Sequence, residues 1–117
     1  MPIYDSNPIH GFNVRLACEH GTDVAIFISV LDNHMRQYID NQELPGCPDF
    51  TCLHRDGLDW MPFTSNHLQK LFPYWCRGQI SQIKEQARRT GMFHEEDFFD
   101  TDRRIPTIWL AIGRRRA

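Results

Sequence analysis

The clearest hydrophobic pattern in the chain lies in its first third, where apolar side chains recur with the roughly 3.6-residue period of one helix face. They occupy positions 24, 27, 28, 31, 35 and 38. Thr22 and Asp23 stand directly before this pattern and offer an N-cap. The spacing predicts a long, well-buried helix over residues 24–39. A shorter helix is indicated before it, over residues 13–19, with Gly21 after its end.

The middle of the chain predicts a loop, a short strand and a short helix. Residues 40–57 are rich in Asn, Pro, Gly and Asp and are expected to form the loop. Alternating apolar and polar positions over 57–63 indicate the strand. The helix covers residues 66–72 after a cap at Thr64-Ser65, and Pro73 stops it because proline disfavours helical geometry in the residue before it.

The last third of the chain predicts a longer helix and a β-hairpin. Helix 77–89 places Ile80, Ile83 and Ala87 on one side, and its other side is mostly polar. A Thr-Gly pair ends this helix. Over residues 92–112, two apolar segments flank an acidic run and a charged tip, which is typical of a hairpin.

This order of elements is that of a winged helix-turn-helix, in which two helices pack at a steep angle and a hairpin projects beside them. We therefore predict an α+β fold with about three or four helices and a C-terminal β-hairpin wing. The chain divides into an N-terminal arm at 1–13, a winged-helix domain at 14–112 and a basic tail at 113–117.

The second half of the chain also resembles a known family. Its pattern reads Asp59-Trp60, Thr64-x3-Leu68-x2-Leu71-Phe72-Pro73-Tyr74-Trp75, x4-Ile80-x2-Ile83 and x6-Thr90-Gly91-Met92. This pattern is similar to the N-terminal winged-helix domains of phage and plasmid replication proteins, the replisome organisers and related initiators. Residues 21–31 are similar to the family's first buried helix, and residues 102–112 to its wing. The resemblance covers residues 12–112 and implies DNA binding through a recognition helix at 77–89.

Charge is distributed unevenly along the chain. The net charge of −2 argues against a general polyanion binder. Residues 1–69 hold three basic against nine acidic side chains, a net of −6, whereas residues 70–117 hold ten against six, a net of +4. Such asymmetry hints at an end of the protein that faces nucleic acid.

If the domain binds duplex DNA, helix 77–89 enters the major groove, where arginine can pair with guanine and glutamine with adenine. The candidates for contacts with base edges or phosphates are Arg77, Gln79, Ser81, Gln82 and Lys84. Phosphate contacts are expected from Lys70, Arg88, Arg89, Arg103 and Arg104. The same polar side chains are also what the solvated face of an amphipathic helix carries.

An acidic run in the hairpin supports a second interpretation. Its members are Glu95, Glu96, Asp97, Asp100 and Asp102. Carboxylates beside a phosphate backbone weaken the counterion release that dominates DNA affinity. The run could instead meet a basic protein surface, or form a solvated edge that discourages strand pairing. The alternative function is a protein-binding winged helix, a phage-encoded inhibitor or adaptor of host machinery. Acids on the same face as Arg77 and Gln82 would favour it, and a basic face would favour DNA.

Metal and enzymatic chemistry have little support in the pattern. The Cys47-x4-Cys52-x-His54 segment could combine with Cys18 and His20, but its spacing is not the tight C-x2-C of zinc sites. We predict no metal and no cofactor, and expect reduced cysteines in the core. No G-x-S-x-G, P-loop or H-E-x-x-H motif occurs, so we predict a non-enzymatic protein.

Location and assembly follow from simpler features. No apolar stretch approaches the roughly 18 residues of a membrane span, and no secretory signal is visible, so we expect a cytoplasmic protein without a membrane partner. A homodimer would supply the affinity and site length that one short helix lacks. Its interface could use the N-terminal arm or the 40–57 loop.

Overall fold

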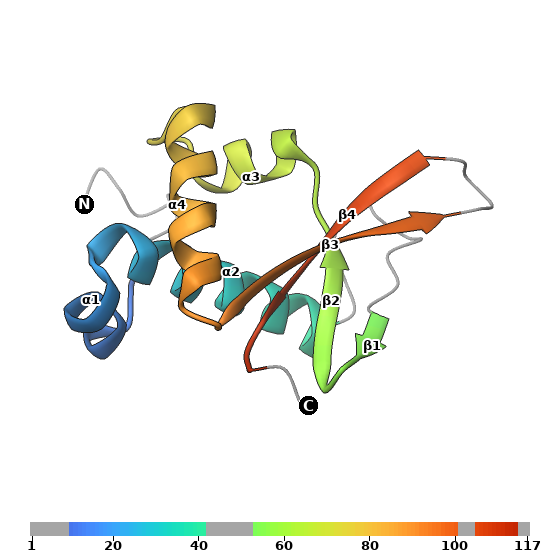
Figure 1. The fold of residues 1–117 in the computed structure, drawn as a ribbon, viewed down its shortest axis with the longest axis horizontal. Helices are drawn as coiled ribbons and strands as arrows, with labels where there is room; N and C mark the ends of the chain where they lie inside the picture. Colours follow the sequence, from blue (N-terminus) through green and yellow to red (C-terminus); the bar gives the residue numbers. More distant parts are fainter. Residues whose placement is uncertain (1–9, 42–52, 101–104, 115–117) are drawn as a thin grey trace, which may run out of the picture.

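The structure is a computed structural model that describes residues 10–41, 53–100 and 105–114. These residues form helices and an antiparallel sheet, in the order α1 (Val14–His20), α2 (Thr22–Asn41), β1 (Leu53–Arg55), β2 (Leu58–Pro62), α3 (Ser65–Leu71), α4 (Arg77–Arg89), β3 (Phe93–Asp100) and β4 (Ile105–Ile112). The sheet has the strand order β1-β2-β4-β3. Figure 1 shows the helices gathered in one part of the molecule and the β3–β4 hairpin projecting away from α4.

Both predicted N-terminal helices are present, and α2 confirms the predicted periodicity at the five positions whose side chains the structure describes. Asn13 caps α1 by accepting a hydrogen bond from the backbone N–H of Leu16 at 3.0 Å. No residue of α1 is buried, although the structure describes all seven. Along α2 the buried side chains are Val24, Ala25, Phe27, Ile28, Val30, Leu31 and Met35. Helix α2 is therefore the central element on which the others pack.

The two helices α3 and α4 and the turn between them also match the prediction to within one residue. Thr64 caps α3, because its hydroxyl accepts a hydrogen bond from the backbone N–H of His67 at 3.0 Å. The side chain of Gln69 donates to the carbonyl of Trp75 at 2.6 Å and to that of Phe72 at 3.3 Å, which holds the turn. Helix α4 buries the expected Ile80, Ile83 and Ala87.

The sheet register separates a face that meets the helices from an outer face. Met61 and Glu95 both lie opposite Leu110, and Met61 and Leu110 belong to the main core. Trp60 and His94 both lie opposite Ala111, on the other face. There Trp60, Ala111 and Leu58 form a second buried cluster, against which Trp109 packs. Glu95 therefore lies on the side of the sheet that faces the helices.

Large aromatic rings fill the main core where the helices meet the sheet. The ring of Phe27 in α2 stacks on Phe72 with centroids 5.3 Å apart and meets the edge of Phe93 at 5.1 Å. Phe72 stacks in turn on Trp75, 5.1 Å away. Phe27, Phe72 and Phe93 are almost completely buried. Aromatic contacts thus join α2, the α3–α4 turn and the start of β3.

The predicted loop at residues 40–57 is wrong at both of its ends. Helix α2 continues to Asn41, and β1 pairs with β2 through a turn at Asp56 and Gly57. Both turn residues have positive φ, 58° and 75°, as two-residue hairpin turns with an Asp-Gly sequence require. A three-residue strand is too short to show alternation. The remaining loop, 42–52, and most of the predicted arm, 1–9, lie outside the described residues.

Phe72→Ala is expected to lower the free energy of unfolding by about 3–5 kcal/mol, because it removes a ring that packs on two others at the centre of the fold. Phe12→Ala is the matched control, since that phenylalanine is 44% exposed; it should cost no more than about 1 kcal/mol. Urea denaturation followed by tryptophan fluorescence measures both. Equal losses in the two variants would contradict the packing described here.

Candidate nucleic-acid interface

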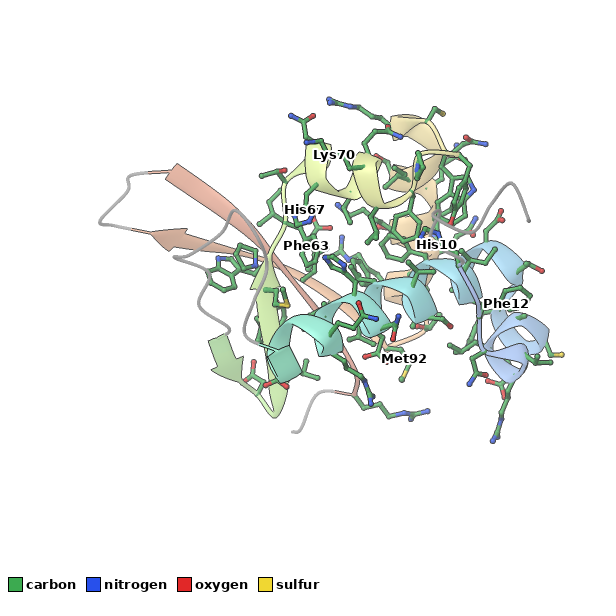
Figure 2. The ribbon with its side chains drawn as sticks, turned by 180° about the vertical axis from the view of Figure 1, so that it is seen from behind. His10, Phe12, Phe63, His67, Lys70 and Met92 are labelled. Atoms are coloured by element: carbon green, nitrogen blue, oxygen red, sulfur yellow. The ribbon has the colours of Figure 1, made fainter. Side chains whose placement is uncertain are left out.

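The outward side of α4 is polar, and α3 extends the exposed surface beside it. Opposite the buried Ile80 and Ile83, the exposed positions include Gly78, Ser81, Gln82, Glu85 and Arg89. Lys70 is exposed on α3, and Figure 2 shows it on the outer side of that helix. Ser81, Gln82 and Lys70 thus have the exposure that a contact with DNA requires.

Two of the predicted DNA contacts make hydrogen bonds within the protein at the start of α4. The side-chain oxygen of Gln79 accepts a hydrogen bond from the backbone N–H of Cys76 at 2.9 Å, which satisfies a donor that the helix itself leaves open. The guanidinium of Arg77 donates to the side-chain oxygen of Asn66 in α3. Arg77 and Gln79 therefore position α4, and Asn66 is a contributor that the sequence did not single out.

One predicted DNA contact pairs with a member of the acidic run. The ammonium of Lys84 lies 2.7 Å from a carboxylate oxygen of Glu95, and the two side chains are 21% and 23% exposed. Lys84 is on the flank of α4, and Glu95 is on the helix-facing side of β3. The two charges neutralise each other at the junction between the helix and the hairpin.

The two arginines at the end of α4 share one carboxylate. Arg88 lies 3.6 Å and Arg89 4.0 Å from oxygens of Glu85, and all three side chains are at least half exposed. Exposed pairs of this kind contribute little to stability and exchange readily with other anions. Arg88 and Arg89 can therefore turn toward a phosphate, although Glu85 reduces the charge that they present.

The rest of the predicted site is only partly described. Glu96 is half-buried, and its neighbour across the ladder is Trp109, on the outer face of the sheet. Asp97 and Asp100 lie in β3, but their side chains are outside the described residues. Arg103, Arg104 and Asp102 are outside them entirely. The structure therefore describes the helical part of the predicted site, whereas the residues of the wing tip lie outside the described ranges.

The charge of the helix pair is clearly positive. Between residues 65 and 91 there are five lysines and arginines against one acid, a net of +4. Glu95 is the described acid that reaches α4, and it is neutralised by Lys84. Among the described residues, the surface around α3 and α4 therefore carries more cations than carboxylates, and its carboxylates include Glu85 on α4 and Glu95 beside it.

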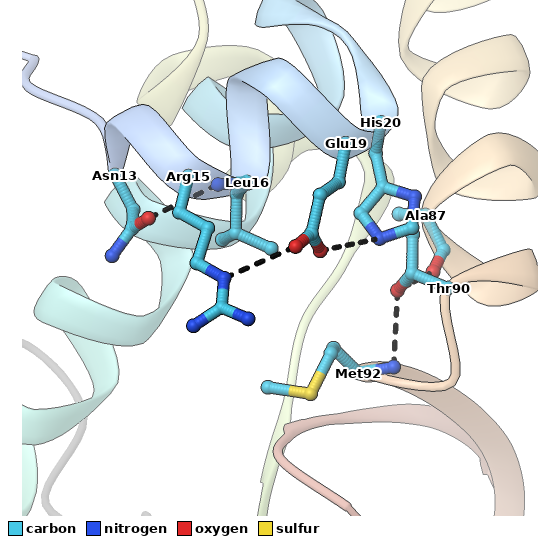
Figure 3. A network of polar contacts seen from close by, with 8 residues as sticks. All are labelled: Asn13, Arg15, Leu16, Glu19, His20, Ala87, Thr90 and Met92. Carbon is cyan, nitrogen blue, oxygen red and sulfur yellow. Dashed lines mark hydrogen bonds and ion pairs between the residues drawn. The ribbon is translucent and has the colours of Figure 1, made fainter.

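A network of polar contacts surrounds the C-terminal end of α4 (Figure 3). The hydroxyl of Thr90 donates to the carbonyl of Ala87 at 2.7 Å and accepts from the backbone N–H of Met92 at 3.0 Å. Figure 3 shows α1 next to this turn, with Glu19 between Arg15 and His20. Gly91 follows with a φ of 78°, which lets the chain reverse into β3. The position of α4 relative to β3 is therefore defined at this end.

A histidine pair lies under α3, and no sequence signal pointed to it. The rings of His34 in α2 and His67 in α3 are 5.7 Å apart, and each also faces Phe63. Figure 2 shows His67 beside Phe63. Burial, followed by the repulsion from His67, lowers the pKa of His34 below its usual 6.5. Burial, followed by the charge of Lys70, lowers the pKa of His67 in the same way.

The cysteines are not placed as predicted. Cys18 and Cys76 carry free, exposed thiols, because one lies on the uncovered helix α1 and the other caps α4. Cys47 and Cys52 lie outside the described residues, as does the side chain of His54. Within the ranges that the structure describes, His, Cys, Asp and Glu form no group of three or more that could hold a metal ion.

Comparison with protein-family models, with curated proteins and with solved structures found no match for this chain. Among the described residues, no helix has both the length and the apolar character needed to cross a membrane.

The histidine pair predicts that folding stability falls as the pH decreases. Both pKa values are lowered in the folded protein, so the unfolded chain takes up protons first, and stability that is complete above pH 6.5 is lost below it. Urea midpoints measured between about pH 7.5 and about pH 5 should fall less in His67→Gln than in the wild type. The exposed His20→Gln is the control and should follow the wild type. An unchanged pH dependence in His67→Gln would refute the prediction.

Proposed function

We propose that this protein binds double-stranded DNA as a winged helix-turn-helix domain, with α4 as the recognition helix. The single observation that carries the proposal is the excess of cations on the exposed helix pair α3–α4, joined to an apolar face that fixes α4 on the core. With Lys84 neutralised by Glu95, four cations remain against one carboxylate, a net of +3. Duplex DNA is the partner that a basic helix surface of this size fits, because phosphate contacts supply most of the binding energy.

The arrangement of the elements supports the same proposal. The order α2, β2, α3, α4, β3, β4 and the strand neighbours β2-β4-β3 are those that place a second helix outward beside a hairpin. Helix α4 has 13 residues and is therefore about 20 Å long, and the diameter of an α-helix with its side chains, about 10–12 Å, fits the roughly 12 Å width of the major groove. The resemblance of residues 12–112 to phage and plasmid initiator domains points to replication or transcription control in a mobile element.

The side chains divide into those that read bases and those that bind phosphates. Gln82 and Ser81 are exposed on the outward side of α4 and are the proposed contacts with base edges. Lys70, Arg88 and Arg89 are the proposed phosphate contacts, because all three are exposed and the pairs of Arg88 and Arg89 with Glu85 are weak. Arg77 orients α4 through Asn66 and lies at the edge of the same surface.

Binding to random duplex DNA across a salt series tests the proposal. Each phosphate contact contributes about −0.9 to the slope of log K against log salt concentration. Arg89→Gln should therefore weaken binding and make the slope shallower by about 0.9. Gln82→Ala should change the sequence preference in a selection experiment and cost about 1–3 kcal/mol at the preferred site.

Arg36→Gln is the matched control for Arg89→Gln. Both arginines lie on helices, both pair with an acid four residues earlier, and their side chains are 74% and 76% exposed. Arg36 is on α2, away from the proposed interface, so its loss should leave the affinity and the slope unchanged. No binding by the wild type at about 50 mM salt would overturn the proposal and leave a protein partner as the function to test.

A further inference from the structure

The Lys84–Glu95 pair differs from the other ion pairs of α4 in its burial and in what it connects. Its 2.7 Å separation and its exposures of 21% and 23% contrast with Arg88 and Glu85, which are 3.6 Å apart and more than half exposed. Arg88 and Glu85 belong to one helix, whereas Lys84 and Glu95 join α4 to β3. The pair can therefore constrain how two elements are placed relative to each other.

The pair lies at the edge of the main core. Lys84 follows the buried Ile83, and Glu95 comes two residues after the buried Phe93, so both Glu95 and Phe93 point to the helix-facing side of the sheet. A carboxylate in such a position is costly to bury unless a cation neutralises it. Lys84 supplies that cation.

Apart from the Lys84–Glu95 pair, the described polar contacts that fix α4 to neighbouring segments lie near its ends. Arg77 bonds to Asn66 at the start of the helix, and Thr90 holds the turn after its end. The apolar stripe of α4 is narrow, because its buried residues are Ile80, Ile83 and Ala87. Lys84 lies between the two ends of the helix, where a charged contact to β3 opposes rotation of α4 about its axis.

We propose that the Lys84–Glu95 pair is a positioning contact that sets the rotation of α4 against the hairpin, and that Lys84 makes no phosphate contact of its own. The inference rests on the proposed DNA-binding function for its consequence, since the rotation of α4 decides whether Gln82 and Ser81 face the groove. It assigns Lys84 to the scaffold and leaves phosphate binding to Lys70, Arg88 and Arg89.

Exchange of the two charges tests the proposal. The variants are Lys84→Glu, Glu95→Lys and the double exchange, with Lys84→Arg as the conservative substitution. Each single reversal places like charges together, so we expect a lower thermal midpoint and DNA binding weaker by about 2- to 30-fold. The double exchange should restore the thermal midpoint and the DNA binding, and Lys84→Arg should retain them. DNA binding is measured well below every midpoint, so that loss of folded protein cannot account for a loss of affinity.

The salt slope separates a positioning residue from a phosphate contact. In the double exchange we expect the wild-type slope, because the number of phosphates bound is unchanged. A double exchange that recovers the thermal midpoint but has a slope shallower by about 0.9 or more would show that Lys84 binds phosphate, and would overturn the proposal. The exposed Arg15–Glu19 pair, exchanged in the same way, is the control and should change neither quantity.

The stability measurements decide the structural half of the proposal even if the wild-type protein does not bind DNA. Recovery of the thermal midpoint in the double exchange, after a loss in both single variants, would support the contact between α4 and β3. Midpoints that are simply additive would refute it. Failure to bind DNA would overturn the proposed function, whereas additive midpoints would overturn the positioning contact.

Discussion

The rest of the structure depends on the packing of one narrow apolar stripe, that of α4, against the aromatic core. Ile80, Ile83 and Ala87 are buried, and the remainder of the helix is polar or small. Ala87 is completely buried, so the backbone of α4 comes close to its neighbours at that point. Phe93 then enters the same core directly after the turn. Because α4 and the start of the hairpin pack into the same core, the orientation of one depends on the position of the other.

Helix α3 shows how strongly a short element depends on its surroundings. It has seven residues and buries Leu68, and a helix of that length is not stable alone in water. Its position comes from the Thr64 cap, the Gln69 bonds to the turn and the ring contacts of His67. Gln69 and His67 are half-buried, and the lowered pKa of His67 predicts that this first helix of the proposed DNA-binding pair is where the stability of the fold depends on pH.

Local sequence signals were sufficient for most of the fold, and tertiary contacts account for what they missed. The period of α2, the stop at Pro73 and the Thr-Gly end of α4 each act within one turn of the chain. The strand β1 was not predicted, because three residues are too few to show alternation, although the Asp56-Gly57 sequence is typical of a hairpin turn. In the candidate site, the helical period was enough to predict which side chains of α4 are exposed. It could not predict the partners of Arg77 and Lys84, because these lie 11 positions away in the chain on other elements. The cap formed by Gln79 was readable from its spacing to Cys76.

The internal bonds of α4 limit what its charge can do. One of its cations is neutralised by Glu95, two share Glu85, and Arg77 is bound to Asn66. A net charge counted along the sequence therefore exceeds the charge that a phosphate backbone would meet. For the proposed function, this shifts weight from general electrostatic attraction to the few contacts that remain exposed, above all Gln82 and Ser81. If Lys84 fixes the rotation of α4, it is not available to bind a phosphate, so the affinity for DNA of any sequence is lower. In return, the side chains proposed to read bases have a fixed direction, which favours the distinction of one DNA sequence from another.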